Sequence, residues 1–259
     1  MVLPLRAACP LDCAAMHAAQ TIREAVAEVE RLRAESRATP AIGQAVVRIK
    51  RFQAARFTGT YADLLASSTY GAAAGFFLEE LYGERDYADR DAQFARIAGA
   101  VEKLFPRDVA ETAAALARLH ALTESLDHAM AIVVPLADAE DPGAYVRAWQ
   151  AVGRRPDRQQ QLDAVVTMGA EMTRITRLPG LRMALRMMRG AAAAAGLSAL
   201  QRFLEAGFDT FGAMAKKRGS AEQFLGTIRT REQQLMELLF DGDPVAGETE
   251  LRRILGQAR

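Results

Sequence analysis

Apolar side chains recur at intervals of three and four residues along almost the whole chain. In the segment 13–37, Ile22, Val26, Val29 and Leu32 follow one another at steps of four, three and three, which places them on one face of a helix. Valine, isoleucine and threonine never gather into the alternating runs that are typical of strands. The pattern therefore predicts an all-α protein without a sheet.

Capping residues and prolines mark where the helices start and indicate a compact bundle of about ten to twelve helices. Thr39-Pro40, Asp141-Pro142 and Asp243-Pro244 each place a capping side chain before a proline, which is favoured at the first helical position. Ser220 with Gln223 has the spacing of a capping box. We expect a helix to begin at each of these four places.

Breaks in the pattern predict where helices end and where the chain divides. We expect the Thr58-Gly59-Thr60 step to end one helix, and residues 179–195 to form another without interruption. The clearest shift in composition lies near Asp138, so we divide the chain into an N-terminal region, 1–137, and a C-terminal region, 138–259. The two regions could share one core.

The most distinctive segment, 75–83, reads GFFLEELYG. It is followed by Asp86, by the pair Arg90-Asp91 and by the segment 120–127. Over residues 44–134 the chain resembles a family of uncharacterised bacterial proteins that takes its name from the FFLEELY motif. The resemblance implies a helical fold and a cytoplasmic bacterial origin, and it implies no activity, substrate, cofactor or partner.

Within the motif, the aromatic residues are expected to pack in the core. On a helix, Phe76, Phe77, Glu80 and Leu81 share one face, whereas Glu79 points away. We interpret Phe76, Phe77 and Leu81 as packing residues. We expect the same of Tyr82, with its hydroxyl hydrogen-bonded.

Glu80 is a carboxylate on an aromatic face and is the first candidate for chemistry. Desolvation there would raise its proton affinity, which would suit a general acid or a metal ligand. We favour the simpler interpretation that Glu80 forms an ion pair with Arg90 or Arg56. Arg90 and Asp91 are therefore included in the candidate polar site.

The second candidate is the helix that carries His120, Glu124, Asp127 and His128. His120, Glu124 and His128 follow at steps of four, so two of them could bind one metal ion. We favour hydrogen bonds for His120 and Asp127 and a solvated His128. Haem or metal bound through His120 stays open as the alternative, whereas a di-iron site is disfavoured because no Glu is followed by His at the third position.

The two cysteines favour a reducing, cytoplasmic environment and no structural disulfide. Cys9, Cys13 and His17 are spaced by four and could offer three zinc ligands. We do not favour a site there, because chain termini are usually poorly ordered. The stretch before Cys9 is too short and is broken by Pro4 and Arg6, so it does not fit a signal-peptide core and we expect neither secretion nor lipidation. We also expect no cofactor and no metal.

Charge is balanced over the whole chain, with 33 Lys and Arg against 32 Asp and Glu. This argues against a DNA-binding protein. Residues 154–189 nevertheless hold eight arginines against three acids, and Arg182, Arg186 and Arg189 form a stripe. The stripe could contact an anionic membrane, RNA or an acidic partner, although we favour solvation or pairing with the acidic turn 84–91. No uncharged run is long enough for a transmembrane segment.

No complete catalytic or nucleotide-binding motif is present. The sequence lacks a phosphate loop, a Gly-x-Ser-x-Gly elbow, a His-Glu-x-x-His motif and a dinucleotide-binding glycine pattern. We therefore expect a helical cytoplasmic protein that acts by binding a protein partner or by self-association, without catalysis of its own. Whether it is an enzyme stays open, with the His120 haem or metal protein as the main alternative.

Overall fold

The computed structural model describes residues 10–81 and 87–258. Within these ranges the chain forms thirteen α-helices and one 3-10 helix, and it contains no strand. The predicted all-α class is therefore confirmed, although the helices slightly outnumber the ten to twelve expected. None of the helices in these ranges combines the length and the apolar character that a membrane crossing requires.

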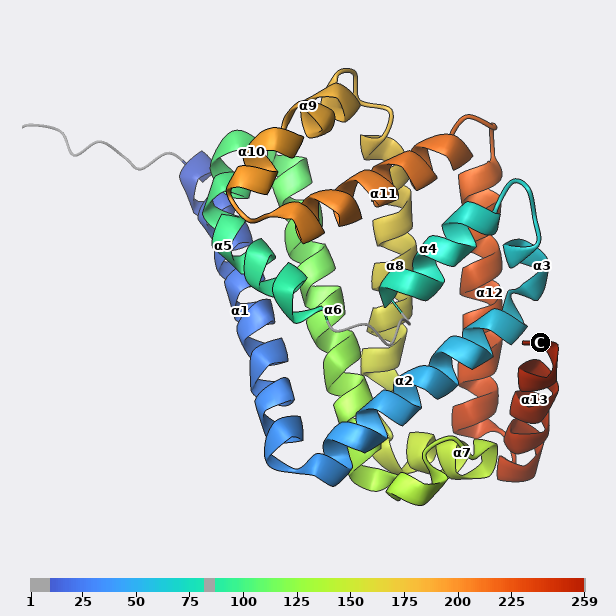
Figure 1. Ribbon diagram of the computed structural model, residues 1–259. Coiled ribbons are helices and arrows are strands. Elements are labelled where there is room, and N and C mark those ends of the chain that lie inside the picture. Colours follow the sequence, from blue (N-terminus) through green and yellow to red (C-terminus); the bar gives the residue numbers. More distant parts are fainter. Residues whose placement is uncertain (1–9, 82–86, 259) are drawn as a thin grey trace, which may run out of the picture.

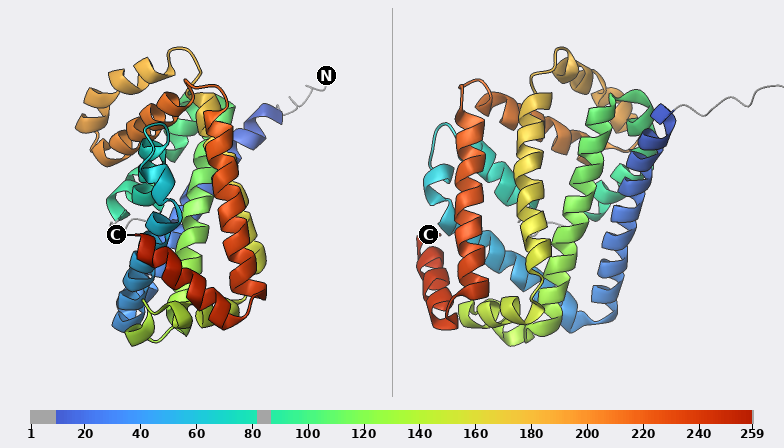
Figure 2. Two further views of the ribbon diagram at one scale, coloured as in Figure 1. Left: turned by 90° about the vertical axis from the view of Figure 1, so that its right-hand side faces the viewer. Right: turned by 180° about the vertical axis from the view of Figure 1, so that it is seen from behind.

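Four long helices form one layer of the molecule. They are α1 (Pro10–Ala38), α6 (Arg107–Val133), α8 (Arg155–Ile175) and α12 (Ser220–Asp241). They lie side by side in that order, as the view from behind in Figure 2 shows. Helices far apart in the sequence are thus neighbours in this layer.

A second layer crosses one face of the first at steep angles (Figure 1). It contains α2 (Pro40–Thr60), α4 (Gly71–Leu81), α5 (Ala88–Leu104) and α11 (Ser198–Met214), and α3 (Ala62–Leu65) leads from α2 to α4. The region between the two layers near α5, α6, α8 and α11 contains the candidate site described below.

Short elements close the two ends of the bundle (Figure 1). At one end lie the 3-10 helix Leu136–Asp138, α7 (Pro142–Val152) and α13 (Pro244–Gln257). At the other end α9 (Leu181–Met187) and α10 (Arg189–Ala194) pack on α11.

Three clusters of buried apolar side chains hold the layers together. One joins α1, α5 and α6 through residues such as Ile22 and Val101. The other two contain residues from both sides of position 138, for example Phe52 with Leu251, and Phe77 with Phe224. Apolar burial therefore links the two predicted regions directly.

The expected helix end at Thr58-Gly59-Thr60 is confirmed, because α2 ends at Thr60 and the short helix α3 begins at Ala62. A Cβ atom at Gly59 would lie 2.0 Å from the backbone oxygen of Ile254 in α13. The glycine, which lies next to the helix end, therefore also allows the close approach of two helices. Sequence alone cannot separate these two uses of glycine inside an apolar pattern.

The expected continuous helix over 179–195 is also wrong. Gly180 adopts φ 78°, α9 begins at Leu181, and the chain bends at Met188 before α10. Gly190 weakens helix propensity just after the bend. The bend lets apolar side chains of both short helices face α11, as Leu185 and Ala192 do in lining the same hollow.

The predicted caps are confirmed at two of the four helix starts. Asp141 accepts a hydrogen bond from the backbone N–H of Ala144 over 2.8 Å, and Asp243 accepts one from Val245 over 2.7 Å. Thr39 makes no side-chain cap, and Gly219, at φ 79°, takes the cap position expected of Ser220. The capping-box prediction is therefore wrong, because Ser220 lies inside the first turn and its hydroxyl is buried there.

Candidate functional site

Helix α4 places the two phenylalanines of the motif against α11 and α12. The ring of Phe77 lies 5.6 Å from that of Phe224, edge to face, and Phe76 stacks on Phe203 at 5.9 Å. Aromatic pairs at such distances add stability beyond the burial of their area. This packing fixes the face of α4 that also carries Glu80.

Glu80 forms an ion pair with Arg90. Nη1 of Arg90 donates to a carboxylate oxygen of Glu80 over 2.8 Å, and both side chains are largely buried. The guanidinium lies over the ring of Tyr87, 4.1 Å from its centroid, and 4.9 Å from that of Phe203. Of the two arginines considered for Glu80, the structure pairs Arg90 with it, whereas Arg56 binds Glu232.

Asp91 is the centre of this cluster, and its side chain is only 4% exposed. One oxygen lies 2.7 Å from Nη2 of Arg33 and 2.9 Å from Nε2 of His120. The other lies 3.6 Å from Nε of Arg90. We call Arg33, Glu80, Arg90, Asp91 and His120 the polar cluster.

The partners of Asp91 keep it ionised. Burial by itself would raise the pKa of Asp91, but the hydrogen bonds from His120 and Arg33 and the charge of Arg90 hold that pKa below its usual value. The pKa of Arg33 is raised despite burial, because Arg33 donates to Asp91 and Glu30. The core of the cluster is therefore a buried carboxylate held by cationic and hydrogen-bonding groups.

Sequence reasoning missed two members of this site, Arg33 and Tyr87. Arg33 follows Val26 by seven residues and Val29 by four, so it lies on the apolar face of its helix. A long cation at such a position is a signal for a buried partner, and it could have been found. Tyr87, whose hydroxyl donates to the backbone oxygen of Glu79, precedes α5 in a turn where no periodic signal exists.

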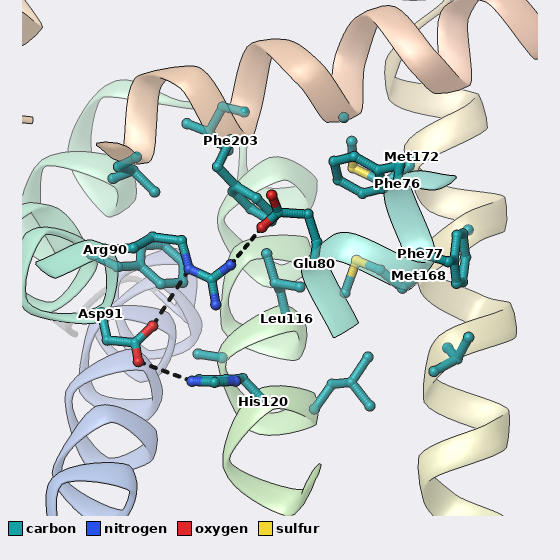
Figure 3. Close-up of a pocket in the computed structure, with 18 of the residues that line it drawn as sticks. Phe76, Phe77, Glu80, Arg90, Asp91, Leu116, His120, Met168, Met172 and Phe203 are labelled. Atoms are coloured by element: carbon teal, nitrogen blue, oxygen red, sulfur yellow. Dashed lines mark hydrogen bonds and ion pairs between the residues drawn. The ribbon is translucent and has the colours of Figure 1, made fainter. Parts of the chain in front are cut away.

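The polar cluster forms one wall of a small hollow of about 100 Å³ (Figure 3). Glu80, Arg90, Asp91 and His120 line it, and its other lining side chains are apolar. Figure 3 shows Phe76, Phe203, Leu116, Met168 and Met172 around the same space. The smaller hollow is therefore lined by charged side chains on one side and by aromatic and aliphatic side chains on the others.

A larger hollow of about 340 Å³ adjoins the smaller one. Leu116 of α6, Met172 of α8 and Leu204 of α11 line both. Thr112 and Gln201 are its only polar lining residues in the described ranges, and α9 and α10 cover one side through Leu185 and Ala192. The two hollows together form an apolar space with a charged end.

Glu124 and Asp127 belong to a different cluster, further along α6 towards its C-terminal end. Glu124 accepts a hydrogen bond from Lys50 over 2.5 Å, and Asp127 accepts one from Gln53 over 3.0 Å. Burial raises the pKa of Asp127, against the opposing charge of Lys50. The structure thus divides the six candidate polar residues into two groups, and neither Glu124 nor Asp127 lines the hollows.

The expectation of a solvated His128 is wrong, because its side chain is buried. Its Nδ1 lies 3.3 Å from the hydroxyl of Ser36, and its Nε2 lies 3.3 Å from a carboxylate oxygen of Glu35. Helix α1 covers this side of α6, and a helix pattern cannot show that a second helix lies against its polar face.

The arginine stripe is largely engaged by acids of α11. Arg182 pairs with Asp209 at 2.7 Å, and Arg189 forms a two-pronged contact with Glu205. The hydrogen bonds from Arg189 and Gln201 lower the pKa of Glu205 to about 2. Arg186 has no hydrogen bond or ion pair among the described residues. Arg182 and Arg189 therefore form ion pairs within the protein, with α11, whereas residues 84–86 of the acidic turn lie outside the described residues.

Some candidates fall outside the described residues. They are Cys9, Tyr82 and the side chains of Leu81, Cys13 and His17. In the remaining chain no group of three or more His, Cys, Asp or Glu side chains is placed to hold a metal ion.

The chain belongs to the family described as Domain of unknown function (DUF8198), whose model matches residues 32–246. Membership of an uncharacterised family agrees with the resemblance noted from the sequence, and the match extends well into the C-terminal region. It carries no information on the FFLEELY motif itself. No curated protein and no solved structure matches the chain significantly.

Proposed function

We propose that this member of the DUF8198 family is a non-catalytic binding protein of the bacterial cytoplasm whose ligand is a small, mostly apolar molecule. The observation that supports the proposal is the apolar space between α5, α6, α8 and α11 with the polar cluster at one end. Apolar pockets with a few fixed polar groups are the general form of small-molecule sites.

The size of the two hollows supports a ligand. Protein interiors are normally packed as densely as organic crystals, so a hollow of about 100 Å³ between the layers is space that a ligand can fill. The larger hollow, at 340 Å³, lies within the range of about 300–1,000 Å³ found for small-molecule pockets. Its apolar lining offers water few hydrogen bonds, so an apolar molecule fits it better than solvent.

The lining supports binding rather than catalysis. In the part of the chain that the structure describes, Thr112 carries the only hydroxyl that lines the hollows, and no cysteine lines them. Nucleophilic catalysis commonly uses such a group next to a base. The charged groups of the polar cluster are instead paired with one another.

Native mass spectrometry of the purified protein, with an absorption spectrum of the same sample, is the first test. A bound organic mass without visible absorption is the expected result. Haem absorption or a metal mass would contradict the proposal and support the alternative of a haem or metal protein that uses His120. An oligomer without bound mass that also fails the following test would favour self-association.

A fluorescent probe tests the site directly. N-phenyl-1-naphthylamine is uncharged and brightens in apolar surroundings, so we expect it to bind. Leu116→Trp and Leu204→Trp should each fill the space from one side and weaken probe binding at least tenfold, because both side chains line both hollows. Val133→Trp, at an exposed position at the end of α6, is the matched control. Unchanged binding by both filling variants, folded by circular dichroism, would overturn the proposal.

A second candidate function is contact with an anionic membrane through α9 and α10. Met183 and Met187 are 64% and 78% exposed, and Arg186 beside them has no partner among the described residues. Exposed apolar side chains next to cations are typical of membrane-surface helices. Co-sedimentation with phosphatidylglycerol vesicles, lost on Met187→Ser with Arg186→Glu and absent with phosphatidylcholine, would support this candidate. Equal binding by the double variant would remove it.

A further inference from the structure

The polar cluster contains a ring nitrogen that has no partner in the described part of the chain, Nδ1 of His120. The other ring nitrogen, Nε2, faces the ionised Asp91, which can only accept a hydrogen bond. A neutral imidazole that donates from Nε2 carries a lone pair on Nδ1. His120 lines the smaller hollow, so the group it offers there is an acceptor.

Arg90 offers a donor beside this acceptor. Its Nη1 is bound to Glu80 and its Nε faces Asp91, whereas no hydrogen bond joins Nη2 to any residue in the described ranges. Arg90 also lines the smaller hollow, and it neighbours His120 because the two side chains face the two oxygens of the Asp91 carboxylate (Figure 3). A ligand at this point therefore meets one acceptor and one donor.

The charge of the cluster favours a neutral ligand. Glu80 and Asp91 balance Arg33 and Arg90, and Glu30 adds a further negative charge at the outer side of Arg33. An anionic head group would bring an uncompensated charge into a largely buried place, which is costly. A cationic head group would find both carboxylates already paired.

A hydroxyl group satisfies both partners without a charge, because it donates one hydrogen bond and accepts others. We propose that the ligand is an uncharged apolar molecule that ends in a hydroxyl, which donates to Nδ1 of His120 and accepts from Arg90. The apolar body then fills the two hollows. This inference rests on the proposed function and specifies the chemical class of its ligand.

Displacement of N-phenyl-1-naphthylamine by molecules of one chain length tests the inference. The series is 1-decanol, decyl methyl ether, decanoate and decylammonium. We expect 1-decanol to displace the probe at a concentration about tenfold lower than each of the others does. A tenfold ratio matches the energetic cost of one buried hydrogen bond that is not made or one buried charge without a partner. Equal displacement by the alcohol and the ether, or preference for an ion, would overturn the inference while leaving the proposed function intact. Absence of probe binding would instead refute the proposed function.

Two histidines of the same helix provide matched variants. His120→Leu should bind the probe but lose the tenfold preference for the alcohol over the ether, and His120→Gln, which keeps an acceptor and a donor, should retain part of it. His128→Leu removes a buried histidine that lies away from the hollows, so it should keep the full preference. Full preference in a folded His120→Leu would overturn the inference. If that variant does not fold, the displacement series on the unaltered protein by itself decides whether the inference holds.

Discussion

Nε2 of His120 lies 2.9 Å from Oδ2 of Asp91, although 29 residues separate the two in the sequence. The contact joins the middle of α6 to the first turn of α5, and Arg33 of α1 reaches the same carboxylate oxygen over 2.7 Å. One buried carboxylate therefore links three helices at the wall of the candidate site.

Asp91→Asn should lower the free energy of unfolding by about 3 kcal/mol, because it leaves buried cationic groups without their anion. Urea denaturation at pH 7 measures this. Asp89→Asn is the matched control, since Asp89 lies exposed in the same first turn of α5 and loses the same interaction with the helix dipole. Equal losses in the two variants would show that the polar cluster does not stabilise the fold.

Low pH should remove the contribution of Asp91 to the stability of the fold. Its pKa is held below the ordinary value of 3.8, so its stabilisation is complete above that value and is lost as the pH falls through the lowered pKa. The stability difference between the unaltered protein and Asp91→Asn should be constant from pH 7 to pH 5 and shrink below 3.8. A difference that is already reduced at pH 5 would contradict the lowered pKa.

Asp127→Asn should raise the free energy of unfolding at high pH, whereas Asp91→Asn should lower it. Burial raises the pKa of Asp127, so its ionised form costs stability in the folded state at high pH. Asparagine still accepts the hydrogen bond from Gln53 and carries no charge. We expect the variant to be more stable than the unaltered protein at pH 8, with the gain shrinking as the pH falls through the raised pKa towards 3.8. Urea denaturation measures the stability. If Asp127→Asn is less stable than the unaltered protein at pH 8, the charge of Asp127 stabilises the fold and the prediction is wrong. Asp138→Asn, at an exposed position, serves as the control.

Gly59→Ala should lower the free energy of unfolding by at least about 2 kcal/mol, because the new Cβ would overlap the backbone of α13 at Ile254. Gly226→Ala in α12 is the control, since no atom lies within 4 Å of its Cβ position. That variant should gain about 1 kcal/mol from helix propensity. Thermal unfolding of both variants tests the close contact, and a stabilised Gly59→Ala would contradict the packing of α2 on α13.

The two predicted regions should unfold together. Trp149, the only tryptophan, lies in α7 and contacts Phe240 of α12 at 5.4 Å, so its fluorescence reports on the C-terminal region. Far-ultraviolet circular dichroism reports on all helices. We propose a shared core and expect the two signals to change at the same urea concentration. Two separate transitions would indicate that regions 1–137 and 138–259 fold independently.

The sequence by itself was enough to predict the helices, because each helix is specified by apolar spacing within a few neighbouring residues. The faces of α1 and α5 and the proline-started helices α7 and α13 follow from that spacing and from Asp141 and Asp243. Phe76, Phe77 and Glu80 share a face for the same local reason. Arg33 could also have been found, since its spacing places it on an apolar face.

Only the tertiary structure decided which of these faces meet. Arg33 and Asp91 are 58 residues apart, and nothing local distinguishes Asp91 from Asp89 as the buried partner. The burial of His128 depends on α1, and the role of Gly59 depends on α13. The hollows are spaces between helices and belong to no segment of the sequence. Apolar helix faces attract one another without direction, so the choice among many pairings is made by packing and by the few buried charges that must find partners.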